Sequence, residues 1–182
     1  MLTITIPPTE LYSDITGFIT VKGQTLRLEH SLRSVSLWES KWKVNYLNNP
    51  NKSKEADLDY VRCMTIGWES VDPNVYKCLT TEQLARIQQY INDPMTATTI
   101  SQYGPKKKSP RKKLTSEQIY SYMVQLNIPF EADKWHLNRL LTLIEVCGVS
   151  QSSNNKMSKK DAARTQREIN EARLAAKQQK HG

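Results

Sequence analysis

The sequence predicts a mainly α-helical protein with a small antiparallel β element at its N-terminus. Near the N-terminus, apolar residues alternate with polar ones, which is the period of a half-buried strand. From Ser31 onward they recur every three or four positions, which is the period of a helix. Turn-forming and basic segments interrupt this pattern. We therefore expect a β-hairpin plus helices over 1–100, a basic linker over 101–113, a helical hairpin over 114–149 and a helical or disordered tail over 150–182.

The charge distribution separates the folding part of the chain from its extensions. The net charge is +8, of which residues 106–113 contribute +6 and residues 151–182 contribute +5, so the remaining residues carry −3. Hydrophobic content is 38% and the mean hydropathy is −0.62, which indicates that part of the chain is linker or tail. Because the excess of positive charge is confined to these extensions, the composition does not predict a folded basic groove for nucleic acid.

Two segments form the predicted β element. Leu2, Ile4 and Ile6 alternate with threonines, and two prolines follow and end the strand. Farther along, residues 18–21 and 25–28 flank a short Lys-Gly-Gln segment, and this spacing predicts a hairpin with its turn at Gly23.

The first predicted helix begins after Ser31, a residue suited to capping it. Its apolar face carries Leu32, Val35, Trp38 and Trp42, and Glu39 lies off that face. Two interpretations of the tryptophans are open, because aromatic residues at this spacing form either a core or a ridge that binds a partner.

Further helix starts follow from local capping signals. Ser53 is expected to cap a helix over 54–65 with Leu58 and Val61 inward, and Asp72-Pro73 is expected to open a short helix. Two capping boxes, Thr80 with Gln83 and Thr115 with Gln118, open two more helices, the first with Leu84, Ile87 and Ile91 inward and the second with Ile119 and Met123.

The strongest helical pattern runs from Phe130 to Gly148. Leu137, Leu140, Leu141 and Ile144 form its apolar stripe, and its first turn is expected to contain Trp135 and His136. We expect Asp133 to cap it and Gly148 to end it.

No combination of residues predicts catalysis, a metal site or a cofactor. The three histidines and three cysteines lack zinc-ligand spacing, and the sequence contains no phosphate-binding glycine loop and no nucleophile elbow. The scattered cysteines favour a reducing compartment. We expect no secretory signal and no membrane-spanning segment, and we expect the protein not to be an enzyme.

Five blocks within residues 26–147 resemble a family of tailed-bacteriophage proteins that we identify with the tail assembly chaperones. The blocks are residues 26–42, 58–65, 71–76, 90–98 and the segment Trp135-His-Leu-Asn-Arg-Leu-Leu-Thr-Leu-Ile144. The N-terminal strands and the tail lie outside them.

The resemblance implies a non-enzymatic role in the bacterial host cytoplasm. Such chaperones bind the long helical tape-measure protein, keep it soluble while tail-tube subunits polymerise around it, and are absent from the finished virion. Tape-measure protein and possibly tail-tube protein are thus the implied partners, and self-association is expected because many copies would coat a long client. The candidate partner-binding residues are Trp38, Trp42, Trp135 and Leu137.

Two alternative functions remain open. A small nucleic-acid-binding protein would use the basic residues Lys106, Lys107, Lys108, Arg111, Lys112 and Lys113, with affinity that falls steeply with salt. A structural tail or neck component would instead remain in purified virions.

Overall fold

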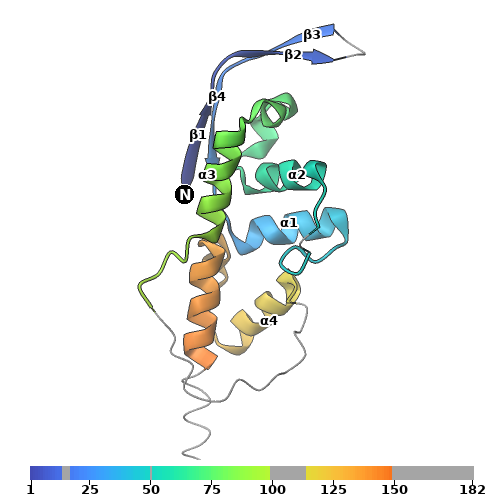
Figure 1. Ribbon diagram of the computed structural model, residues 1–182. Coiled ribbons are helices and arrows are strands. Elements are labelled where there is room, and N and C mark those ends of the chain that lie inside the picture. The colour runs from blue at the N-terminus through green and yellow to red at the C-terminus, as the bar shows by residue number, and fades with distance from the viewer. Residues whose placement is uncertain (14–16, 50, 99–113, 149–182) are drawn as a thin grey trace, which may run out of the picture. The chain divides into compact units, whose positions relative to one another are not determined.

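The computed structural model describes residues 1–13, 17–49, 51–98 and 114–148. Residues 1–143 make one compact unit, and residues 144–148 belong to a second. The first unit is mainly helical with a small antiparallel β element at its N-terminus (Figure 1), which confirms the predicted fold class at this level. The predicted basic linker and C-terminal tail fall outside the described residues.

The β element consists of two antiparallel segments, which we call arms: the N-terminal arm contains β1 and β2, and the second arm contains β3 and β4. Strand β1 (Leu2–Ile6) pairs with β4 (Gln24–Leu28), and β2 (Thr9–Ser13) pairs with β3 (Gly17–Val21) in the same register. The hairpin predicted around Gly23 is therefore wrong. Its two segments follow one another on one arm, because both pair with the N-terminal arm rather than with each other (Figure 1).

Gly23 lies between the two paired stretches, where its backbone approaches Ile6 and Pro8 closely. A Cβ atom there would lie 2.8 Å from Pro8 Cδ and 3.2 Å from the carbonyl oxygen of Ile6. We predict that Gly23→Ala lowers the free energy of unfolding by about 1–3 kcal/mol, because the proline ring must shift. Urea unfolding measures this, and Lys22→Ala, at the exposed neighbouring position, should change stability by less than about 0.5 kcal/mol. Equal effects of the two substitutions would contradict the close approach as the cause.

The capping predictions for the first two helices are confirmed. Helix α1 (Leu32–Trp42) begins at Ser31, whose side chain accepts a hydrogen bond from the backbone N–H of Ser34. Helix α2 (Lys54–Met64) begins at Ser53 in the same way. Each cap satisfies an amide that the helix leaves without a partner.

The later helix starts are also confirmed. The 3-10 helix η2 (Pro73–Cys78) is capped by Asp72, and both predicted capping boxes open helices, α3 (Thr81–Asn92) and α4 (Ser116–Gln125). The inward residues differ in part: Ile87 is buried, but Leu84 is 38% exposed and Leu58 only half-buried.

The helix predicted over 130–148 is divided in two. A 3-10 helix, η3 (Phe130–Lys134), comes first, and an α-helix occupies residues 137–148. Between them His136 makes a β-bridge with Ser31, and Leu137 N–H donates to the carbonyl oxygen of His30. Tertiary pairing therefore delays the helix start, and Trp135 and His136 precede the first turn.

Asp133 does not cap this helix, contrary to the prediction. It lies in η3, and its carboxylate accepts a hydrogen bond from the Tyr120 hydroxyl at 3.2 Å. The end of the helix beyond Gly148 lies outside the described residues, so the predicted glycine stop stays a prediction.

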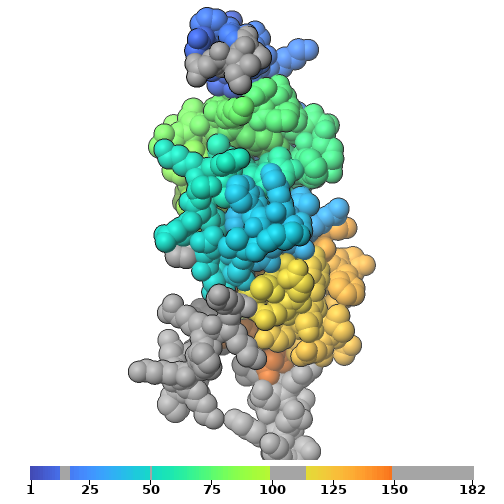
Figure 2. Space-filling model, turned by 90° about the vertical axis from the view of Figure 1, so that its right-hand side faces the viewer, coloured from blue at the N-terminus to red at the C-terminus, as the bar shows by residue number. Residues whose placement is uncertain are grey.

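A buried carboxylate joins α4 to α1. Glu39 is 8% exposed, although its helical position predicts that it lies off the apolar face. Its carboxylate accepts hydrogen bonds from the backbone N–H of Tyr46 and from both the N–H and the hydroxyl of Ser116, at 2.6–2.8 Å. Figure 2 shows α4 lying directly against α1.

The core lies between β1, β4 and the helices of the first unit. Its largest fully buried side chains are Trp38, Tyr60, Ile4, Ile6, Leu26, Leu28, Leu32, Met64, Ile119, Met123, Leu137 and Leu140.

Candidate functional site

The structure separates the four predicted partner-binding residues by burial. Trp38 is 1% exposed and Leu137 is 0% exposed, and the Trp38 indole donates to the carbonyl oxygen of Ala56 at 2.8 Å. Both are therefore core residues. Trp42 is half-buried and stacks on Trp38, with ring centroids 5.9 Å apart, whereas Trp135 is 40% exposed. The six basic candidates from Lys106 to Lys113 lie outside the described residues.

A cavity of about 320 Å³ opens beside the N-terminal half of α1. Large apolar side chains and charged side chains of both signs line it. The apolar residues are Leu37, Met64, Ile66 and Trp68, and the charged ones include Arg33, Glu69 and Lys134.

The backbone after α2 builds one side of this cavity. Glu29 N–H donates to the carbonyl oxygen of Met64, and Ile66 N–H donates to that of Arg27, so this segment pairs with the end of β4. Gly67 then turns the chain with φ of 74°, a conformation that glycine adopts without steric cost. The turn leaves Ile66 48% exposed beside the cavity.

A network of hydrogen bonds and ring contacts centred on Asp59 fixes the positions of Trp42 and Trp68. Its carboxylate accepts hydrogen bonds from Arg62 at 2.8 Å, from Lys41 at 2.7 Å and from the Trp42 indole at 2.8 Å. Arg62 in turn lies over the Trp68 ring, 4.5 Å from its centroid. Burial alone would raise the pKa of Asp59, but these hydrogen bonds outweigh it and hold the pKa below its ordinary value. The cavity wall at Trp68 (in the 3-10 helix η1, Trp68–Ser70) is therefore preorganised.

Cys63 lines the same cavity but is not activated as a nucleophile. Burial raises the pKa of its thiol to about 11, so the thiol stays protonated at neutral pH. Within the described residues, no group of three or more His, Cys, Asp and Glu side chains is arranged to hold a metal ion.

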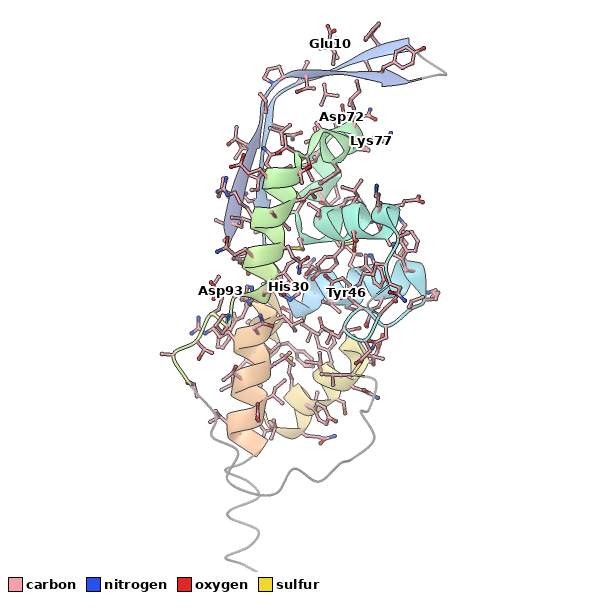
Figure 3. The ribbon with its side chains drawn as sticks, viewed as in Figure 1. Glu10, His30, Tyr46, Asp72, Lys77 and Asp93 are labelled. Atoms are coloured by element: carbon pink, nitrogen blue, oxygen red, sulfur yellow. The ribbon has the colours of Figure 1, made fainter. Side chains whose placement is uncertain are left out.

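A second polar cluster is sealed in the core, where it is not accessible to a ligand. Figure 3 labels His30 and Tyr46, whose side chains lie among the helices of the first unit. His30 Nδ1 lies 2.5 Å from the Tyr60 hydroxyl, and the Tyr60 ring stacks on Tyr46. The His136 ring packs edge-on against His30, with centroids 5.1 Å apart.

The cavity was not predicted from the sequence. Ile66 and Trp68 lie outside any periodic pattern, and their neighbours from α1 and η3 are distant in the chain. The only local signal was two large apolar residues flanking a glycine, which is typical of an exposed turn. The cavity could hold a bulky apolar side chain, and its charged residues could contact polar groups of the same ligand.

Comparisons with protein-family models, with curated proteins and with solved structures found no match. Among the described residues, no helix has both the length and the apolar character needed to cross a membrane.

Proposed function

We propose that this protein is a non-enzymatic tail assembly chaperone of a tailed bacteriophage. It binds the tape-measure protein in the bacterial cytoplasm, keeps it soluble while the tail tube assembles, and does not remain in the virion. The resemblance of the blocks within residues 26–147 supports the family. The observation that carries the binding role is the cavity beside α1, because its apolar wall suits the side chain of a helical client.

The arrangement of the cavity favours a helix as the client segment. An amphipathic helix presents apolar side chains at every third or fourth position, with charged residues beside them. One such apolar side chain would fill the space between Leu37, Ile66 and Trp68. Arg33, Lys134 and Glu69 would meet the flanking charges of both signs and set the orientation of the helix.

Co-expression with the tape-measure protein of the same genome tests this function. We predict that the chain increases the soluble fraction of that protein and co-purifies with it at high salt. Ile66→Asp should weaken this association by roughly tenfold or more, because it places a charge against the apolar anchor. Leu84→Asp is the matched control, since Leu84 is also an exposed aliphatic residue but lies on α3, away from the cavity.

The outcomes separate the competing interpretations. If Trp42→Ala and Trp135→Ala abolish binding while Ile66→Asp does not, the client binds at these tryptophans, as the sequence predicted, and not at the cavity. If the tape-measure protein stays insoluble and the chain binds nucleic acid at low salt through Lys106–Lys113, the chaperone function is wrong. Detection of the chain in purified virions would favour a structural tail component.

A further inference from the structure

The ribbon of β2 and β3 carries the most exposed aromatic side chains among the described residues. Phe18 is 75% exposed and Tyr12 is 68% exposed, and the two face each other across the strands with ring centroids 5.4 Å apart. In Figure 1 this ribbon bends away from β1 and β4 and lies above the helices. Within the described part of the chain, neither strand has a neighbour on its outer edge.

An isolated two-stranded ribbon is only marginally stable in water, and its outer edges carry unpaired backbone groups. The two edges differ in how well they are protected. Strand β2 contains Glu10, which projects from the exposed face (Figure 3), and two prolines precede it. Strand β3, Gly-Phe-Ile-Thr-Val, has no charged residue and no proline, so nothing in it opposes the addition of another strand.

We propose that β3 pairs antiparallel with β3 of a second copy of this chain. The result is a four-stranded sheet in the order β2-β3-β3-β2, with a two-fold axis passing between the two copies of Ile19. This register places Phe18 opposite Thr20 of the other copy and brings the two Phe18 rings into diagonal contact. The inference does not depend on the proposed function.

A second copy fits this edge better than other occupants do. The two-fold arrangement is self-complementary, because every residue of β3 meets an uncharged residue of the same strand. Pairing through β2 would instead bring two copies of Glu10 near each other. The pairing also covers Phe18, whose large exposed surface lies on β3 itself.

The oligomeric state of the full chain tests the proposal. Analytical ultracentrifugation at high salt, over about 1–100 μM, should show a dimer that increases with concentration. Ile19→Lys and Ile19→Glu should each raise the dimer dissociation constant by roughly tenfold or more, because like charges then face each other across the axis. An equimolar mixture of the two variants should recover the dimer.

Leu11→Lys provides the matched control. Leu11 pairs with Ile19 on the same face of the ribbon and is similarly half-buried, but it lies on β2, away from the proposed contact. It should leave the dimer intact. Ile19→Cys is a milder variant, and under oxidising conditions its introduced thiol should form a disulfide with the same thiol of the second copy, identified by mass spectrometry. The corresponding link should not form in Leu11→Cys.

Three results would overturn the proposal. The first is a wild-type chain that stays monomeric throughout the concentration range. The second is equal loss of the dimer in Leu11→Lys and in Ile19→Lys. The third is a dimer that both Ile19 charge variants retain while Ile19→Cys forms no disulfide between the two copies, which would place the contact elsewhere.

Discussion

Replacing Glu39 with alanine is expected to lower the free energy of unfolding by about 3 kcal/mol. The carboxylate is buried, and three donors depend on it: the N–H of Tyr46, and the N–H and hydroxyl of Ser116. Alanine would remove the acceptor that all three groups share. Its effect should therefore exceed that of losing a surface hydrogen bond.

The position of Ser116 explains why the effect should extend to α4. Ser116 is the first residue of that helix, where backbone N–H groups lack helical partners and a negative charge is favourable. Glu39, on α1, therefore stabilises the start of α4 through its hydrogen bonds with Ser116. Removing it should increase amide hydrogen exchange in α4 more than in α3.

Urea unfolding of Glu39→Ala, Glu39→Gln and Glu131→Ala checks this prediction. Glutamine keeps one accepting oxygen and should lose about half as much stability. Glu131 is exposed, so its alanine variant should lie within about 0.5 kcal/mol of the wild type. A loss in Glu39→Ala no larger than that in Glu131→Ala would contradict the role of the buried carboxylate.

Lowering the pH from 7.5 to 5 is expected to remove about 2 kcal/mol of stability through His30 alone. The His30 side chain is enclosed by Tyr60, Tyr46 and His136. Burial, reinforced by the nearby His136, lowers the pKa of His30 from 6.5 to about 3.

The sign follows from the two protonation states. Above pH 6.5 His30 is neutral in both the folded and the unfolded chain, so its contribution is fully present. As the pH falls below 6.5, the unfolded chain binds a proton that the folded chain does not, and stability decreases until the pH approaches 3. Acidification therefore destabilises the fold.

Urea unfolding at pH 7.5, 6 and 5 measures this dependence. His30→Gln should have lower stability at pH 7.5 but a flatter dependence on pH, because it removes the titrating group. His181→Gln, which changes a histidine outside the described residues, should keep the wild-type slope. An unchanged slope in His30→Gln would show that other groups cause the acid sensitivity.

The sequence by itself determined the mainly helical class and the starts of α1, α2, η2, α3 and α4. Ser31, Ser53, Asp72 and the two capping boxes were predicted correctly, because a capping hydrogen bond joins residues only two or three positions apart. Apolar periodicity likewise placed Trp38 and Leu137 at positions typical of a core. It could not separate a core position from a binding surface, since both require large apolar side chains.

The tertiary structure alone decided the features that depend on distant residues. The strand register follows from pairing between the two arms, and the contact of Glu39 with Ser116 joins positions 77 residues apart. The helix predicted over 130–148 is shortened because His136 pairs with Ser31. The cavity beside α1 likewise combines residues from α1, the segment after α2 and η3, so no local pattern could have predicted it.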